Sequence, residues 1–156
     1  MPSLIKSSAT ETALRAALKA EGYRLSRIRG NGETGVDVLA TRRGKSVHIE
    51  VIGFKSSGPA RAKAFMQCFF RAVSRIKDGA TRCVIALPSR WANGFPQRVK
   101  QYGRAWGRIG RAFPELEIWL VDARTRTYSP AKWNSWLMAS RSNRAPPIKR
   151  LKVRRA

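Results

Sequence analysis

The sequence predicts a mixed α/β fold, in which a central sheet carries helices on both faces. Several segments show apolar residues at helical spacing, and two β-rich runs, 36–41 and 46–53, are joined by a short turn. A continuous apolar run at 81–87 is typical of a strand that is covered on both faces. Such a strand requires helices on the two sides of the sheet.

The first half of the chain predicts a helix followed by three strands. Apolar residues at helical spacing indicate a helix over about 9–21, which Gly22 ends. Residues 23–29 alternate apolar and basic side chains and form a weaker strand pattern. The next two strands form a hairpin with a turn from Arg42 to Lys45, where Gly44 supplies the positive φ of a tight turn.

The second half alternates helices and strands. A helix follows Pro59 and stops near Asp78, and the apolar strand comes next. Residues 97–113 predict one continuous amphipathic helix, whose three glycines indicate that another element packs close to its backbone. Residues 116–121 predict a strand and 131–140 a last helix. The order is α-β-β-β-α-β-α-β-α, and the helix-linked strands can pair in parallel.

The composition indicates one domain over residues 1–140 and a basic, proline-broken C-terminal arm over 141–156. Lysine and arginine number 32 against 9 acidic residues, which gives a net charge of +23. Arginine predominates, and its planar guanidinium matches phosphate oxygens. The charge therefore predicts a nucleic acid as partner, DNA first and RNA as a second candidate.

Other partners and compartments are less compatible with the sequence. The cations run along the whole chain, whereas a membrane-surface protein concentrates them in one cluster. No apolar run approaches the roughly 20 residues of a membrane span. Cys68 and Cys83 lie in apolar patterns typical of buried thiols in a reducing compartment. We therefore expect a cytoplasmic protein with no membrane partner.

The hairpin places two acidic residues opposite each other. A two-residue loop centred on Arg43 and Gly44 pairs residues whose numbers sum to 87, so Asp37 faces Glu50. The Cβ atoms of such a pair lie about 4.5–5.5 Å apart, and like charges there repel. A compensating cation is expected, either an arginine or a divalent metal, and oxygen ligands suit Mg²⁺ or Mn²⁺.

The ordered set of elements resembles the PD-(D/E)XK nuclease superfamily. The matching features are the G-x-D motif that ends at Asp37, Glu50 within HIEVIG, Gln67 on the following helix, and the apolar strand that ends at Pro88. They cover about residues 9–122. The resemblance implies a restriction-endonuclease-like αβββαβ core, with Asp37 and Glu50 as catalytic metal ligands for Mg²⁺ or Mn²⁺.

Three further residues follow from this resemblance. Glu11 lies on the apolar face of the first helix, where many members of the superfamily carry a glutamate; it is either a third metal ligand or an acid that complements the helix dipole. The superfamily's lysine would stand at Ile52. Lys55 and Lys63 are the candidates to supply the catalytic ammonium in its place, and if neither does, cleavage has been lost.

Further residues are candidates for binding the substrate. Gln67 and Arg71 continue the helical stripe that Lys63 opens and are expected to position the DNA backbone. Trp91, beside Arg90 in a loop, could stack on a base. The basic face of the 97–113 helix is expected to track phosphates with Lys100, Arg104, Arg108 and Arg111.

These features predict a metal-dependent DNA endonuclease that acts as a homodimer, and a junction-cleaving or nicking activity would fit. Two alternatives remain open. One is a catalytically inactive DNA-binding module on the same fold, which the displaced lysine favours. The other is a basic RNA-binding protein unrelated to nucleases.

Overall fold

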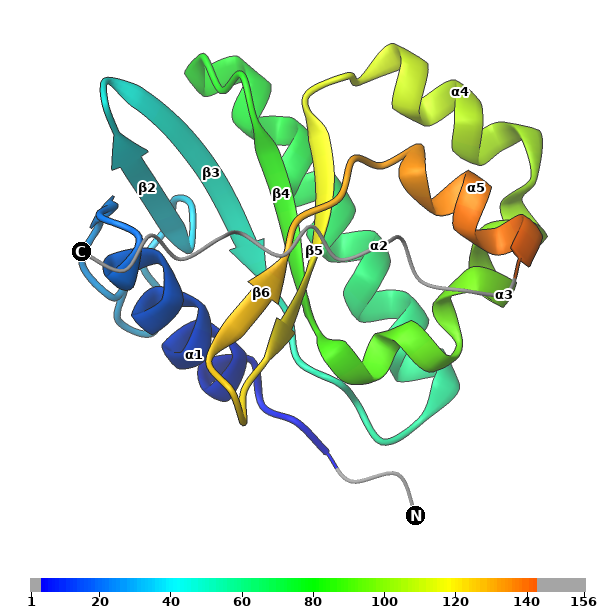
Figure 1. The fold of residues 1–156 in the computed structure, drawn as a ribbon, viewed down its shortest axis with the longest axis horizontal. Helices are drawn as coiled ribbons and strands as arrows, with labels where there is room; N and C mark the ends of the chain where they lie inside the picture. The colour runs from blue at the N-terminus through cyan, green and yellow to red at the C-terminus, as the bar shows by residue number, and fades with distance from the viewer. Residues whose placement is uncertain (1–3, 143–156) are drawn as a thin grey trace.

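The computed structural model describes residues 4–142 of the chain, which form a curled six-stranded mixed sheet with helices on both faces (Figure 1). The helices are α1 (Ser7–Ala20), α2 (Gly58–Ser74), α3 (Phe95–Tyr102), α4 (Arg104–Ala112) and α5 (Ser135–Ser142), with short 3₁₀ turns η1 (Arg75–Asp78) and η2 (Ser89–Asn93). The strands are β1 (Arg24–Leu25), β2 (Val38–Arg42), β3 (Lys45–Val51), β4 (Cys83–Pro88), β5 (Leu116–Asp122) and β6 (Thr127–Ser129). The predicted mixed α/β class is confirmed.

The sheet follows the chain order from β1 to β6. β1, β2 and β3 pair antiparallel, while β3–β4 and β4–β5 pair in parallel across helical connections. β6, which the sequence analysis did not predict, adds antiparallel to β5. The expected strand at 23–29 shrinks to Arg24–Leu25, and the chain then forms a loop as far as β2.

The predicted register of the β2–β3 hairpin is confirmed. Val38 pairs with Ile49 and Arg42 with Lys45, so paired residues sum to 87. Residues 43 and 44 have φ angles of 50° and 72°, the pair of positive values that a type I′ turn requires. This turn fixes which residues of the two strands lie opposite each other.

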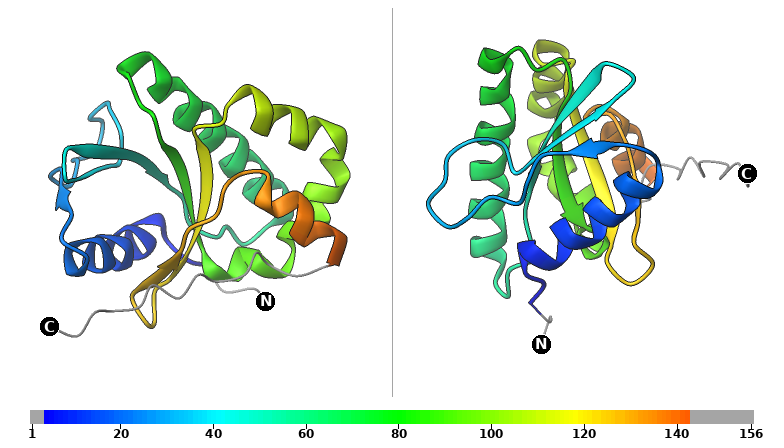
Figure 2. Two further views of the ribbon diagram at one scale, coloured as in Figure 1. Left: turned by 45° about the horizontal axis from the view of Figure 1, so that its top comes forward. Right: turned by 90° about the vertical axis from the view of Figure 1, so that its left-hand side faces the viewer.

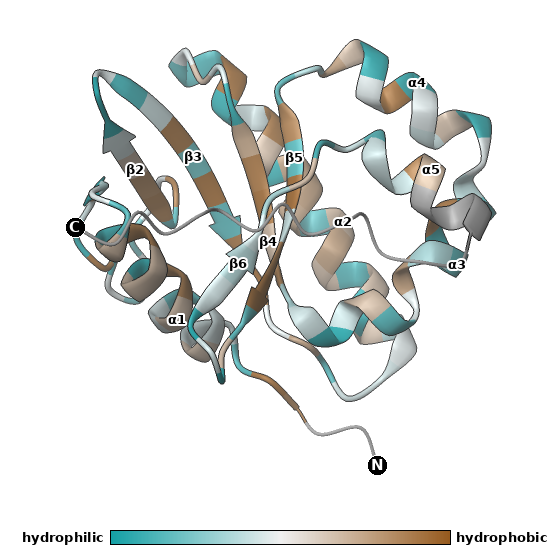
Figure 3. Ribbon diagram, in the orientation of Figure 1, coloured by the Kyte–Doolittle hydropathy of each residue, from teal (hydrophilic) through white to brown (hydrophobic). Residues whose placement is uncertain are grey.

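Each face of the sheet has its own hydrophobic core. α1 covers one face, where Leu14 and Leu18 pack against Val38, Ile49 and Val84. α2 covers the other face, and Figure 2 shows the sheet lying between the two helices. The central strands are correspondingly apolar, as Figure 3 shows for β4 and β5.

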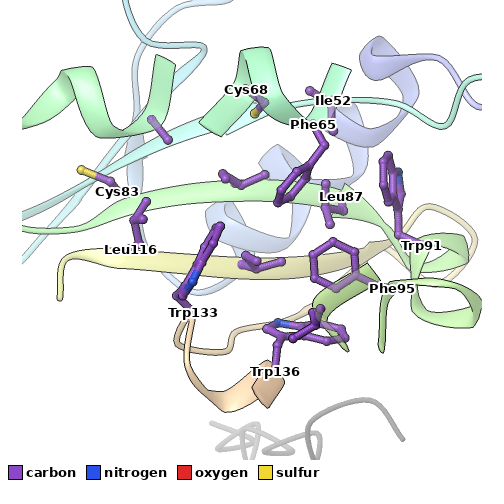
Figure 4. Close-up of a cluster of buried hydrophobic side chains, with 14 of the residues drawn as sticks. Ile52, Phe65, Cys68, Cys83, Leu87, Trp91, Phe95, Leu116, Trp133 and Trp136 are labelled. Atoms are coloured by element: carbon purple, nitrogen blue, oxygen red, sulfur yellow. The ribbon is translucent and has the colours of Figure 1, made fainter. Parts of the chain in front are cut away.

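The core on the α2 face is largely aromatic. Phe65 of α2 lies among Trp91, Phe95 and Trp133, and Figure 4 shows these rings together with Trp136 beside the strands. The indole of Trp133 stacks on that of Trp106 with 3.9 Å between ring centroids. Each indole N–H of this pair donates to the backbone carbonyl of the other residue, at 2.9 and 2.8 Å. α3, α4 and α5 are thereby joined to α2 and to the sheet.

The prediction of one continuous helix over residues 97–113 is wrong. Gly103 has φ 51° and ψ −123°, which no helix accommodates, and the chain forms α3 and α4 on its two sides. The close packing expected at the glycines is present, because a Cβ on Gly110 would lie 2.2 Å from Asn134 Oδ1. The basic residues of this segment therefore belong to two helices and do not form one straight stripe.

Two sequence-based expectations concern other parts of the chain. None of the helices within residues 4–142 combines the length and apolar character needed to cross a membrane. The basic arm expected over 141–156 falls outside the described residues from 143 onwards, and residues 141 and 142 belong to α5.

The segment before α1 is joined to the end of β3. Ile5 and Phe54 exchange two backbone hydrogen bonds of 3.0 and 2.8 Å. Gly53 permits this approach, because a Cβ at that position would lie 2.1 Å from the carbonyl oxygen of Ile5. Residues 4–6 are therefore held beside the segment that follows Glu50.

Gly53→Ala should destabilise the fold, because the new methyl group meets backbone atoms that cannot rotate away. Overpacking of this kind costs about 1–3 kcal/mol in the free energy of unfolding, measurable by urea denaturation. Gly58→Ala is the matched control, since its Cβ would lie 3.9 Å from the nearest atom. Equal stability of both variants would contradict the described contact.

Candidate functional site

A cleft of about 870 Å³ opens where α1 begins, β3 ends and α2 passes. The loop that precedes β2 forms its outer wall and projects on the α2 side of the sheet (Figure 2, right). The residues that line the cleft include five predicted site residues: Glu11, Asp37, Lys55, Gln67 and Arg71. The fold thus brings together side chains from four separate segments of the sequence.

Asp37 and Glu50 are neighbours at the inner end of this cleft. Asp37 stands one residue before β2, so the hairpin register sets it across from Glu50 of β3. Asp37 Oδ2 accepts a hydrogen bond of 2.9 Å from the Val51 N–H. The Asp37 side chain is 16% exposed and that of Glu50 is fully buried, so Asp37 lies between the cleft and Glu50.

The environment of Glu50 is unfavourable to its charge. Burial is the largest cause, and the negative charge of Asp37 adds to it; together they raise the pKa of Glu50 to about 7. Arg71 and Arg75 act in the opposite direction. Arg75 Nε donates to Glu50 Oε1 at 3.0 Å, whereas the buried Oε2 has no hydrogen-bond partner.

Asp37 is held by two arginines that the sequence analysis did not single out. Arg29 forms an ion pair with Asp37 Oδ1. Arg15 donates to the backbone carbonyls of Ser26 and Asp37, at 2.6 and 3.1 Å. These bonds tie the loop before β2 to α1. Arg15 follows Glu11 by four residues, the spacing of a helical ion pair, and this was the one feature of the sequence that could have indicated its contact with the acid.

The two acids allow a test of whether the site fits a divalent metal. The sequence left arginine and metal open as compensating cations, and the structure shows an arginine on each carboxylate. Three of the four carboxylate oxygens accept a hydrogen bond, and Glu50 Oε2 remains without one. Mg²⁺ is typically held by one or two carboxylates, with water and substrate oxygens completing its shell. The two carboxylates are therefore donors of the type that Mg²⁺ or Mn²⁺ takes, and an arginine pairs with each of them.

Glu11 does not join these two acids. Its carboxylate accepts a 3.0 Å hydrogen bond from Arg15 Nε, although the residue lines the same cleft. In the part of the chain that the structure describes, no three His, Cys, Asp or Glu side chains are grouped closely enough to hold a metal ion. The arrangement thus gives Glu11 the role of holding Arg15.

The lysine candidates lie in different places. Ile52, where the resemblance places a lysine, is buried in the core on the α2 face. Lys55 lines the cleft and is exposed, whereas Lys63 is exposed on α2 but not part of the cleft wall. Gln67 and Arg71 of the same helix do line the cleft. Of the two lysines, Lys55 is the one that lines the same cleft as Asp37.

The proposed base-stacking role of Trp91 is wrong. Its side chain is 4% exposed, and the indole N–H donates to the Gly53 carbonyl at 3.0 Å. The ring packs against Phe54, Phe65 and Phe95, so no base can reach its face. Arg90 instead lies over the ring of Phe54, with 5.1 Å between guanidinium carbon and ring centroid.

The predicted phosphate-tracking residues lie away from the cleft. Arg104, Arg108 and Arg111 are exposed on α4, and Lys100 is exposed on the preceding helix α3. Figure 1 places α4 at the opposite end of the molecule from α1 and β2. These residues do not contribute to the cleft, and their contact with DNA stays a prediction.

Comparisons with known proteins concern the fold. No protein-family model matches the chain, and no curated protein sequence matches it. A similar solved structure is an fdxN element excision controlling factor protein from Anabaena variabilis, with 15% sequence identity and a TM-score of 0.51. The likeness covers 78% of this chain and 95% of that one. It shows a shared fold.

The burial of Glu50 predicts a pH-dependent stability. Between about pH 4.5 and 7 the folded protein holds a proton on Glu50 that the unfolded chain releases. The contribution of this group to stability is therefore complete below about pH 4.5 and is lost as the pH rises through 7. In chelator, urea denaturation should show the stability of the wild type falling relative to Glu50→Gln, by up to about 1.4 kcal/mol per pH unit.

Glu117→Gln is the matched control for this measurement. Glu117 is also a buried glutamate on a central strand, but two hydrogen bonds from Arg82, at 2.7 and 2.9 Å, hold its charged form. Although burial opposes it, the contact with Arg82 lowers the pKa of Glu117. The stabilisation that ionised Glu117 contributes to the fold is therefore lost only at more acidic pH, as the pH falls through this lowered pKa. A Glu50→Gln profile parallel to the wild type across pH 4.5–7 would contradict the assignment.

Proposed function

We propose that this chain is a metal-dependent DNA endonuclease of the PD-(D/E)XK type. The observation that supports it is the pair of carboxylates, Asp37 and Glu50, set in register at the inner end of a cleft. Glu50 keeps one buried oxygen without a partner, which is unusual for a purely structural acid. A protein of net charge +23 is suited to hold a polyanion over this cleft.

Asp37 and Glu50 would hold Mg²⁺ or Mn²⁺, which when bound supplies an activated water and a positive charge for the leaving oxygen. The remaining residues act on the DNA. Lys55 and Arg71 line the cleft with positive charge and would neutralise the phosphodiester beside the acids. Gln67, one helical turn before Arg71, would donate a hydrogen bond to the backbone.

The arrangement of elements gives further support. α1, the β1–β2–β3 meander, α2 and β4 follow in the αβββαβ order of the restriction-endonuclease-like core, with β5 completing the parallel part of the sheet. The solved structure that shares this fold is named as a factor controlling excision of an element. A role in cutting or handling DNA agrees with that name.

A second candidate is a DNA-binding module without cleavage activity. Two observations favour it. Each acid already has an arginine partner, Arg29 on Asp37 and Arg75 on Glu50. The superfamily's lysine position is occupied by Ile52, whose side chain is buried. On this alternative the same cleft binds DNA, and the carboxylates serve only to fix the arginines.

A plasmid-nicking assay with Mn²⁺ or Mg²⁺ separates the two candidates. Wild-type protein should convert supercoiled DNA to the open circle, and Glu50→Gln should lower the rate at least about 100-fold, since it removes a charged ligand without changing side-chain size. Mn²⁺ should also raise the melting temperature of the wild type and leave that of Glu50→Gln unchanged.

Glu117→Gln is again the control, because it changes a buried, arginine-paired glutamate that does not line the cleft. It should cleave at a rate within about threefold of the wild type under conditions where both are folded. DNA binding without metal-dependent cleavage or a metal-dependent shift in melting temperature would favour the inactive module.

Substituting each lysine in turn identifies which one supplies the ammonium group that the superfamily carries at the position of Ile52. Lys55→Gln should reduce the cleavage rate by about 100-fold, and Lys55→Arg should recover part of it, because the positive charge returns to the cleft. Lys63→Gln is measured in parallel. A larger loss for Lys63 than for Lys55 would overturn the choice of Lys55.

A further inference from the structure

A second, smaller pocket of about 310 Å³ lies next to the cleft and is bordered by three arginines, Arg61, Arg90 and Arg98. They come from three different elements. Arg61 belongs to the first turn of α2, Arg90 to η2 and Arg98 to the first turn of α3. Among the described residues that line this pocket, none is acidic. The described lining of this pocket therefore carries three positively charged side chains and no carboxylate side chain.

Aromatic rings contact all three guanidinium groups, and Arg61 also donates to the Lys55 carbonyl at 2.8 Å. Arg61 and Arg90 both lie over Phe54, at 4.6 and 5.1 Å from its ring centroid. Arg98 lies over Trp91 at 5.9 Å, and Trp91 packs edge-on against Phe54. Cation–π contacts fix the direction of each guanidinium, and like charges that line one pocket repel each other. An anion bound among the three would reduce that repulsion.

The pocket adjoins the cleft through consecutive residues. Phe54 lines the pocket, while its neighbours Gly53 and Lys55 line the cleft. Successive residues of an extended segment point to opposite sides, which explains this division. The Cα atoms of Phe54 and Lys55 are about 3.8 Å apart. The cleft and the arginine pocket therefore lie on the two sides of one segment, and Arg61 of the pocket donates to the Lys55 carbonyl at 2.8 Å.

We propose that the Arg61–Arg90–Arg98 pocket binds a backbone phosphate of the DNA strand, next to the phosphate at the Asp37–Glu50 pair. The inference rests on the proposed function, since it takes DNA as the ligand. Guanidinium groups bind phosphate oxygens through paired hydrogen bonds. The volume is roughly ten times that of a water molecule in the liquid, enough for a phosphate group with its hydration. The buried indole of Trp91 lines the pocket, and Arg98 lies over its ring.

DNA binding in chelator, measured by fluorescence anisotropy, tests the pocket without cleavage. The variant Arg61→Gln/Arg90→Gln/Arg98→Gln should raise Kd about tenfold at 0.1 M salt. The slope of log Kd against log salt concentration should fall by about 1, as for the loss of one phosphate contact. The matched control is Arg24→Gln/Arg43→Gln/Lys45→Gln, which removes the same charge from exposed positions on β1 and the far end of the hairpin. It should raise Kd less than threefold.

Two further measurements keep the test independent of folding and of DNA. Replacing the three arginines by lysine retains the charge and should preserve most of the salt dependence of DNA binding. Circular dichroism confirms that each variant is folded. Inorganic phosphate should raise the melting temperature of the wild type relative to chloride at equal ionic strength, and the glutamine variant should lose this rise. The control variant should keep it.

The outcomes separate this inference from the proposed function. Equal weakening of DNA binding in the pocket and control variants would overturn the pocket while leaving the nuclease intact. Specific weakening in the pocket variant with no cleavage by the wild type would support the pocket and overturn the nuclease. A wild type that binds no DNA would overturn both.

Discussion

The register of the β2–β3 hairpin is the constraint on which the proposed site depends. Two residues with positive φ at the turn set the pairing, and that pairing carries Asp37 to the position across from Glu50 at the other end of the hairpin. A shift of one residue would turn Glu50 toward the α1 core, where an unpaired carboxylate is costly. The hydrophobic pattern and the turn chemistry therefore position the two acids before any arginine or metal contributes.

Much of the fold could be predicted because its signals are local. The turn at Gly44, the apolar run at 81–87 and the helical spacing of α1 and α2 each depend on neighbouring residues. The break at Gly103 was missed because glycine within an amphipathic pattern is compatible with both a helix and a turn. β6 was missed because a three-residue strand has too little sequence to show a period.

The residues that line the candidate cleft were predicted in part for the same reason. Asp37 and Glu50 were found from hairpin geometry, and Lys55, Gln67 and Arg71 do line the cleft. Their arginine partners could not be found, since Arg29 lies in a loop and Arg75 twenty-five residues beyond Glu50. In a chain with 22 arginines, spacing alone does not distinguish the few that are folded inward. Trp91 was misplaced because a tryptophan beside an exposed loop arginine resembles a binding residue until tertiary packing is known.

The stacked pair of Trp106 and Trp133 gives the protein a built-in optical signal. Two indoles at 3.9 Å with an interplanar angle of 13° are close enough for their electronic transitions to couple. Such coupling produces a near-ultraviolet circular dichroism band that depends on α4 remaining docked near the start of α5. This end of the molecule can therefore be followed spectroscopically without a label, separately from the hairpin that carries the two acids.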